Sequence, residues 1–416
     1  MALESIVPPE PVPAATAGWS VAELEQLALT HNPSIARAAA LVCVAQGEWT
    51  QVGLPPNPVV GYEGQQLGSQ GRAEQHGILF SQEFVRGGKL RLNRCVAAQQ
   101  VHRAQQELAA QQQRVLTDVR IAFARVLIAQ EQIRLTSRLV DISGQMIQTV
   151  NDLIRGLEAS RADLLQAELE SENAELLLQN AINRHDAAWR ELASVVGLRD
   201  LPPGRVLRGD IFAQPRDFDF EERLLSLQSQ SPEVGAAAAR IQQSRFAYER
   251  ALAEPIPNLT VQGLYNVRDN GIGGDPDAGV SVSIPVPLFD RNQGGVSSAR
   301  FQISAAEQEL QQLQLNLRQR LAGVFERYAS SRSQVERYQQ RIIPRADESL
   351  SLTRRTFDAG ETSYLIVLTA QRTYFQTSLA YLESLETLRI AEAELEGFLL
   401  RDSLEGGVVP RPGERP

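Results

Sequence analysis

The sequence predicts a mainly α-helical protein with a small β part, built from two copies of one module. Three observations support this fold class. Matching segments recur about 200 residues apart, far beyond the roughly 20–50-residue period of a solenoid. Each copy contains one helical pattern of unusual length. Each copy also contains two short stretches in which apolar and polar residues alternate, as they do in half-buried strands.

The duplication is visible in three pairs of segments. The first member of each pair lies in the first half of the chain and the second member in the second half. The pairs are Asn32-Pro33 with Ser231-Pro232, 54–58 with 254–258, and 162–168 with 365–371. A repeat of this size indicates duplication of a domain-sized unit.

The expected elements follow from these patterns in order. We predict a disordered Pro-rich N-terminus at 1–19, a first repeat at 20–197, a linker at 198–218, a second repeat at 219–402 and a disordered tail at 403–416. The first repeat should hold strands at 58–67 and 74–84, a long helix at 89–152 and a return helix at 162–196. The second should hold strands at 258–268 and 278–289, a long helix at 291–356 and a return helix at 364–400.

The two long helices carry apolar residues at gaps of three, four and seven, the pattern of an antiparallel coiled coil. About 65 residues at 1.5 Å each correspond to a length of about 98 Å. Pro344 is placed to kink the second of them. Gly156 and Gly360 follow the helices, and glycine supplies the left-handed conformation with which many helices end.

Composition excludes several classes of function. The chain has 416 residues and a net charge of −9, with no basic stripe for nucleic acid. Cys43 and Cys95 form neither a zinc spacing nor a disulfide framework and are expected to be buried or inert. The four histidines are scattered, so no metal site is predicted. No catalytic triad, Cys-His pair or phosphate-binding loop appears in a fitting context, and the Gly-rich stretch 271–274 between two strands is predicted to be an exposed loop.

Neither a transmembrane helix nor a signal peptide is visible. No run of about 18 apolar residues occurs. Residues 1–20 lack a basic n-region and an apolar h-region. The expectation is therefore either a protein that stays inside the cell or a true start upstream of Met1.

The second strand pair shows the clearest alternation. Val280, Val282, Ile284, Val286 and Leu288 alternate with serines and prolines, so the valines should face lipid or a neighbouring strand, and Ser281 and Ser283 should face water. Strands of about 9–11 residues have the length that crosses an outer membrane. Because the smallest membrane barrels have about eight strands, several chains would have to share one barrel. The alternative is a soluble coiled-coil scaffold with two hairpins.

An ordered set of motifs resembles the TolC-like outer-membrane efflux channels, and most closely their metal-efflux (CzcC-like) subgroup. The match covers about 20–400 in both halves. The motifs are Asn32-Pro33, 47–58 with Leu54-Pro55-Pro56-Asn57-Pro58, Ser81-Gln82-Glu83-Phe84 with Gly87-Gly88-Lys89, Phe357-Asp358-Ala359-Gly360, and Leu368-Thr369-Ala370-Gln371.

The resemblance implies a homotrimer in the outer membrane that extends into the periplasm. Each chain would give four strands to a 12-stranded transmembrane β-barrel and long helices to an α-barrel tunnel. The protein would be a passive conduit without active site, cofactor or nucleic-acid partner, possibly for heavy-metal cations. It would contact membrane lipid, a periplasmic adaptor and an inner-membrane pump. A type I secretion outlet has the same fold and is the alternative within this resemblance.

The resemblance also implies functional residues at the two helix turns. The adaptor-contact tip would comprise Gly156, Leu157, Gly360, Glu361 and Thr362. Family members lock the closed tip with a Tyr, an Arg and carboxylates on the innermost helices. Here Asp163 falls near one such carboxylate, whereas Phe357, Thr362, Ile366 and Thr369 occupy the other positions. We therefore expect a gate formed by Asp163, Phe357 and Ile366 with mainly apolar closure; Asp163 could equally be a solvated first-turn carboxylate.

Overall fold

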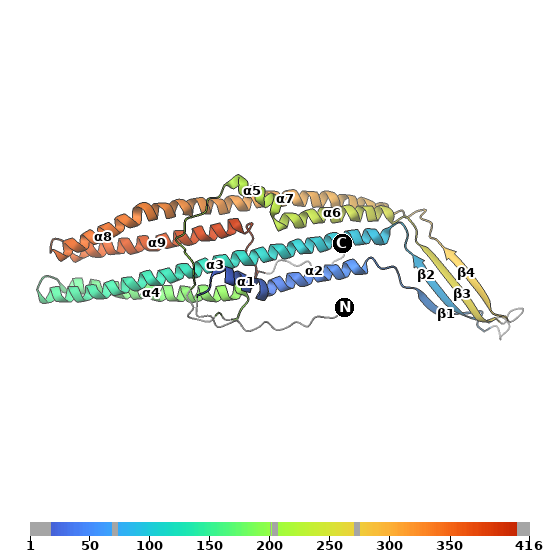
Figure 1. Cartoon of the computed structure of the whole chain (residues 1–416), viewed down its shortest axis with the longest axis horizontal. Helices are drawn as coiled ribbons and strands as arrows, with labels where there is room; N and C mark the ends of the chain where they lie inside the picture. The colour runs from blue at the N-terminus through green and yellow to red at the C-terminus, as the bar shows by residue number, and fades with distance from the viewer. Residues whose placement is uncertain (1–17, 69–73, 200, 202–206, 270–274, 406–416) are drawn as a thin grey trace. The chain divides into compact units, whose positions relative to one another are not determined.

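The computed structural model describes residues 18–68, 74–199, 201, 207–269 and 275–405 (Figure 1). The described residues form two compact units: unit 1 is drawn from 18–36, 111–224 and 319–405, and unit 2 from 37–110 and 225–318. The predicted fold class is confirmed: long helices dominate, with one four-stranded antiparallel sheet. The predicted loop at 271–274 and most of the two predicted disordered ends lie outside the described residues.

Unit 2 contains the sheet. Its strands are β1 (Val59–Gln65), β2 (Gln75–Phe84), β3 (Leu259–Asp269) and β4 (Asp277–Ser283), and they lie side by side in chain order (Figure 1). Every neighbouring pair is antiparallel. The two hairpins of the two repeats therefore meet through β2 and β3.

Four helices of unit 2 follow the same order as the strands. They are most of α2 (Pro33–Gln51), the start of α3 (Lys89–Arg155), all of α6 (Pro232–Ala253) and the first part of α7 (Gln293–Arg337). A small core of Val42, Ala45 and Ala104 joins α2 to α3. Arg250 donates to Asn93 at 2.7 Å between α6 and α3. Arg240 and Arg245 of α6 pair with Glu309 and Glu307 of α7.

Strand β4 is shorter than the predicted 278–289. It ends at Ser283, and the following residues Ile284, Val286 and Leu288 continue the alternation without pairing. Pro285 and Pro287 have no backbone N–H to donate to a ladder, which explains why pairing stops before them.

Unit 1 consists of paired long helices. It contains α1 (Val21–His31), the rest of α3, α4 (Arg161–Val196), the start of α5 (Phe220–Gln230), the end of α7, α8 (Ile343–Asp358) and α9 (Tyr364–Glu396). Helix α3 lies beside α4, and α8 lies beside α9 (Figure 1). Its buried residues include Val119, Val126, Leu192, Leu385 and Leu388. Among the described residues, no helix is both long and apolar enough to span a membrane.

The second long helix is not the single helix predicted for 291–356. A five-residue π-helix, Tyr338–Ile342, separates α7 from α8, whereas α3 runs unbroken for 67 residues. Pro344 lacks an N–H, and its ring would clash with the carbonyl of Gln340 in a regular α-helix. The wider π turn removes that clash.

The C-terminal segment is ordered further than predicted. Ser403 is buried, and the Asp118 carboxylate accepts from the backbone N–H groups of Asp402 and Ser403 at 3.0 and 2.6 Å. Gln111 donates to the carbonyl of Ser403 at 2.9 Å. The predicted disordered tail at 403–416 therefore begins too early, because these backbone groups find partners on α3.

Candidate functional site

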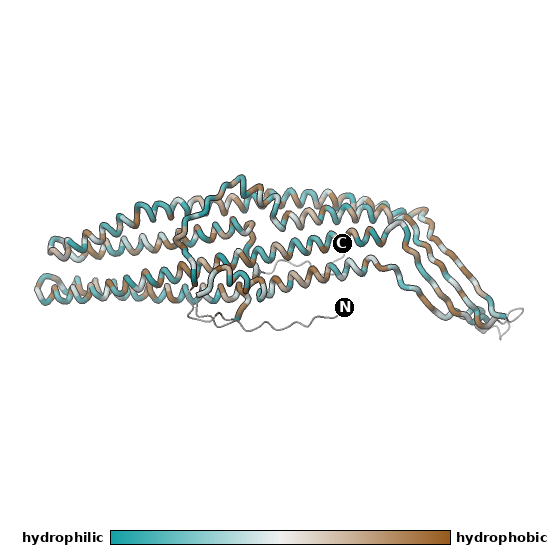
Figure 2. The backbone as a smooth tube through the Cα atoms, in the orientation of Figure 1, coloured by the Kyte–Doolittle hydropathy of each residue, from teal (hydrophilic) through white to brown (hydrophobic). Residues whose placement is uncertain are grey.

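One face of the sheet is apolar and exposed. Residues directly opposite in the register share a face, as in the row Val60, Phe80, Gly263 and Val280. The colours alternate along the strands in Figure 2. The exposed large apolar residues of this face are Val60, Tyr62, Ile78, Phe80, Phe84, Tyr265, Val280 and Val282. A continuous apolar surface of this kind marks an interaction with lipid or another protein.

The opposite face of the sheet is more polar. Ser81, Gln262 and Ser281 lie in one row across three strands, and Glu83, Thr260 and Ser283 lie in the next. Leu79 and Leu264 also belong to this face. The structure thus separates Val280 and Val282 from Ser281 and Ser283, as the alternation predicted.

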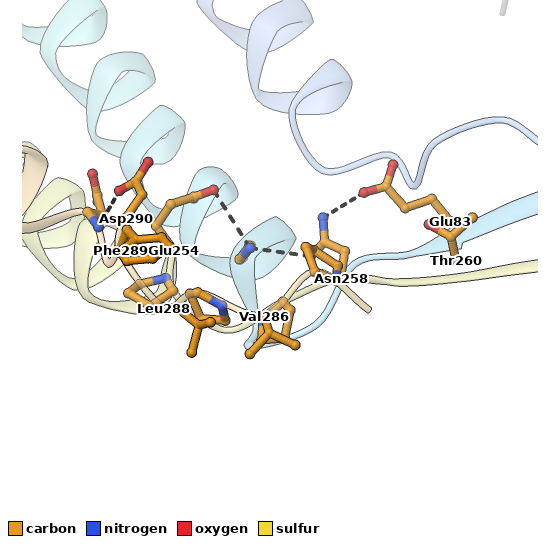
Figure 3. A pocket seen from close by; sticks show the side chains of 14 residues that line it. Glu83, Glu254, Asn258, Thr260, Val286, Leu288, Phe289 and Asp290 are labelled. Atoms are coloured by element: carbon orange, nitrogen blue, oxygen red, sulfur yellow. Dashed lines mark hydrogen bonds and ion pairs between the residues drawn. The ribbon is translucent and has the colours of Figure 1, made fainter. Parts of the chain in front are cut away.

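The strand–helix junction of unit 2 brings several of the motifs together (Figure 3). Lys89 is only 4% exposed, and its Nζ lies 3.3 Å from Oδ1 of Asn258 and 3.7 Å from Glu254. Asn258 donates to Glu83 at 2.7 Å. These residues line a pocket of about 590 Å³ with Pro285 and other residues of the segment after β4. The motifs around Gly87-Gly88-Lys89 and Pro255–Asn258 therefore join strands to helices.

The two helix turns of unit 1 have the same hydrogen bonding but a different residue at the left-handed position. Glu158 N–H donates to the carbonyl of Leu153, and Glu361 N–H to that of Thr356, each five residues back. In each turn the residue before this glutamate donates its N–H to the carbonyl three residues back, Leu157 to Ile154 and Gly360 to Phe357. Both residues have positive φ, 62° for Leu157 and 74° for Gly360. The glycine prediction is correct for Gly360 and wrong for Gly156, because Leu157 takes the left-handed conformation.

A shared core brings the two turns to one end of unit 1. Val150 of α3, Leu164 and Ala167 of α4, and Tyr364 and Leu368 of α9 are buried together. Met146, Ile154, Ala159 and Phe357 pack against this cluster. We call this set of nine residues the tip core. It shows that helices from both repeats form one four-helix tip.

Asp163 caps a helix at this tip. Ser160 donates to the Asp163 carboxylate through its backbone N–H at 2.9 Å and its hydroxyl at 2.6 Å. The Asp163 N–H donates back to the hydroxyl at 3.3 Å. The side-chain and then the backbone bond from Ser160 lower the pKa of Asp163. Because the pKa of Asp163 is lower in the folded protein than in the unfolded chain, the capping interaction stabilises the fold at neutral pH. This stabilisation is lost as the pH falls through the pKa that Asp163 has in the folded protein.

The other predicted tip residues have different surroundings. Phe357 belongs to the tip core, whereas Ile366 is exposed and lies in a groove between α8 and α9. In α4 the N-cap residue Ser160 and Asp163, three residues later, form a capping box. In α9 the N-cap residue is Ser363, whose side chain makes no capping hydrogen bond, and Ile366 stands at the position that corresponds to Asp163. Glu361 is exposed, and Thr362 lies 3.3 Å from Thr356, hydroxyl to hydroxyl.

An ion pair between the two hairpins was missed by the sequence reasoning. Arg372 of α9 donates to the same oxygen of Glu170 of α4 at 2.6 and 3.0 Å. The Glu170 side chain is 11% exposed and that of Arg372 is 44% exposed. Burial, then the negative charge of Glu170, raises the pKa of the neighbouring Tyr364. Arg372 is the one charged residue between 364 and 382, which is a signal that the sequence contained.

Two further predictions concerned metals and cysteines. Within the described ranges, no group of three or more His, Cys, Asp or Glu side chains is arranged to hold a metal ion. Both cysteines are free, but Cys43 is exposed and Cys95 half-buried. Cys43 is therefore not buried, because Val42 and Ala45 form the packed face of α2, and that it is inert stays a prediction.

The structure has the fold of outer-membrane channels. It matches CusC, a protein that forms a transmembrane channel, with a TM-score of 0.76 and 18% identity, covering 95% of this chain and 99% of that one. It matches a membrane protein from Pseudomonas aeruginosa with a TM-score of 0.75 and 18% identity, covering 95% and 100%. These likenesses define the architectural class of the chain.

Sequence comparison identifies the family. The profile of the outer membrane efflux protein family matches residues 24–198 and 224–399, once in each repeat. The cobalt-zinc-cadmium resistance protein CzcC of Cupriavidus metallidurans is 31% identical over 297 residues, covering 71% of this chain and 70% of that protein. The chain belongs to the outer membrane efflux protein family.

Proposed function

We propose that this protein is the outer-membrane channel of a tripartite efflux system. Three copies would form a 12-stranded barrel in the membrane and a helical tunnel in the periplasm, open to an adaptor and an inner-membrane pump. The channel would be a passive conduit, so the pump would supply the energy. The exposed apolar face of the sheet is the observation that supports this proposal most strongly.

The edges of unit 2 support a shared barrel. Helices run in the order α2, α3, α6 and α7, and strands in the matching order β1 to β4. One edge therefore consists of α2 and β1, and the other of α7 and β4. Phe301 and Leu315 of α7, two heptads apart, and Leu41 and Val44 of α2 are exposed. Copies joined edge to edge would cover these residues and pair the open strands.

Heavy-metal cations are the proposed cargo. The name of CzcC assigns cobalt, zinc and cadmium resistance to a relative that is 31% identical to this chain over 297 residues. This relationship favours cation efflux over polypeptide export by a type I secretion outlet. Membership in the outer membrane efflux protein family removes the soluble scaffold from consideration.

Conductance across a planar bilayer tests the channel and its gate. The protein should run as a trimer in detergent and show a low, closed-state conductance. Ile366→Asp should raise this conductance, because it places a charge in the exposed apolar groove proposed to take part in closure. A detergent-free soluble monomer would refute the channel, whereas unchanged conductance in Ile366→Asp would refute only this gate residue.

Leu157 is proposed as an adaptor anchor at the tip, with Gly156, Gly360, Glu361 and Thr362 around it. Leu157 is 94% exposed and has a left-handed conformation that glycine adopts more easily. Leu157→Gly should therefore stabilise the tip by about 0.5–1 kcal/mol and weaken adaptor binding. Guanidinium unfolding and adaptor pull-down measure the two effects.

Gly360→Leu is the matched control for this prediction. It places leucine in the equivalent left-handed position, with open space for its side chain, and should destabilise the tip by about 0.5–1 kcal/mol, the reverse of the Leu157→Gly effect. Undiminished adaptor binding by Leu157→Gly would remove Leu157 from the contact.

A further inference from the structure

Two exposed surfaces of the four-helix tip have complementary shapes. The first is a leucine ridge on α4, formed by Leu165, Leu169 and Leu176, all of them exposed. At 100° per residue these three side chains lie within about 40° of one another. Leu164, Ala167 and Ser171, which are buried, lie about 150° away around the helix. The leucine ridge therefore faces away from the tip core.

The second surface is a groove of about 380 Å³ between α8 and α9. It is lined by Ala346, Ser349 and Thr353 of α8 and by Leu365, Ile366, Thr369, Ala370 and Thr373 of α9. None of these residues is charged. The hydroxyls of Thr353, Thr369 and Thr373 donate to carbonyls of their own helices. The groove thus presents an uncharged surface in which Leu365 and Ile366 are exposed and the three threonine hydroxyls are bonded within their own helices.

The ridge and the groove lie at the same height above the turns. Leu169 follows Ser160 by nine residues, and Ser349 precedes Asp358 by nine, which places each about 14 Å along its helix from the turn. The two surfaces also carry opposite charges at similar heights. Glu172 lies within the leucine ridge, about 18 Å along α4 from its turn, and Arg345 lies beside the groove, about 20 Å along α8 from its turn. Both are exposed, and neither has a charged partner within the described part of the chain.

We infer that the leucine ridge of one copy seats in the α8–α9 groove of the next copy, with Glu172 facing Arg345. The inference rests on the proposed trimer and adds the contact that closes its tip. A ridge and a groove on different surfaces of one chain form a heterologous contact, which is satisfied at every position only when the ring closes. The closed tip would then combine the Glu170–Arg372 pair within each chain with an apolar contact between chains.

Cysteine cross-linking tests this contact. In a Cys43→Ser, Cys95→Ser background, Leu169→Cys with Ser349→Cys should form disulfide-linked trimers on mild oxidation, because a disulfide requires Cα atoms within about 7 Å. The control pair replaces Ser349→Cys by Glu348→Cys, one residue along α8 and exposed but outside the groove lining. It should remain monomeric on a denaturing gel.

The oligomeric state in detergent separates the possible failures. A trimer in which the test pair cross-links no better than the control overturns the ridge-and-groove contact and leaves the proposed channel intact. A monomer in detergent overturns both.

Charge reversal gives an independent readout. Glu172→Arg and Arg345→Glu should each raise the closed-state conductance, and the double variant should return it to the wild-type level. Additive increases in the double variant would show that Glu172 and Arg345 do not face each other.

Discussion

Val282→Arg is expected to destabilise the membrane-inserted protein by about 1–4 kcal/mol, because an arginine on the lipid face costs about 2–4 kcal/mol at the middle of a bilayer and about 0–1 kcal/mol near its interfaces, and Val282 stands one residue before the end of β4. Val282 is 60% exposed on the apolar face of the sheet and lies directly opposite Val261. Ser281→Arg should be tolerated, because Ser281 lies on the polar face opposite Gln262. Folding into vesicles of defined lipid, followed by guanidinium titration, measures both variants.

The pair of variants is informative because the positions are adjacent. Distance from the membrane surface and added charge are nearly equal at Val282 and Ser281, and the loss of the β propensity of valine accounts for at most about 1 kcal/mol, so a larger difference reports the face. Similar losses at the two positions would show that the apolar face of the sheet does not meet lipid.

Arg372→Ala is expected to destabilise the tip by about 1–3 kcal/mol, between the values for exposed and fully buried pairs. The substitution leaves the largely buried Glu170 carboxylate without its partner beside Tyr364. Because the pair joins α4 to α9, its loss should also raise the closed-state conductance. Limited proteolysis of the tip and bilayer recording measure these two effects.

The double variant Glu170→Gln, Arg372→Met provides the control. It removes both charges together, so no unpaired carboxylate remains, and most of the stability should return. A double variant as unstable as the sum of the single variants Glu170→Gln and Arg372→Met would mean that Glu170 and Arg372 do not stabilise the tip through each other.

The elements with strong local signals could be predicted from the sequence. Apolar spacing along α3 and α4, and alternation along β3 and β4, act within one helix or strand, so they can be recognised without knowledge of neighbours. The prolines affected the helix and the strand more than their sequence positions predicted. Pro344 produces a π turn, and pairing of β4 ends at Ser283, before Pro285, although the alternation continues to Leu288.

The contacts of the tip could not be predicted in the same way. Glu170 belongs to a run of acidic residues on α4; its spacing from Ala167 and Ala174 places it on the buried face of the helix, but the sequence around it does not show which cation would compensate a buried carboxylate. It becomes the buried member of an ion pair because α9, about 200 residues later in the chain, brings Arg372 beside it. The left-handed Leu157 was missed for a related reason: the adjacent Gly156 is the residue that local preference selects.

The sequence by itself determined the duplicated architecture, the long helices, the four strands and the family, because these depend on periodicity and on motifs read in order along the chain. Only the tertiary structure decided which charged residues are buried, where the exposed ridge and groove lie, and how the motifs around Lys89 and Asn258 meet. Those features depend on which helix lies next to which, and the energy of a charge or an apolar side chain depends on the neighbours that replace water around it.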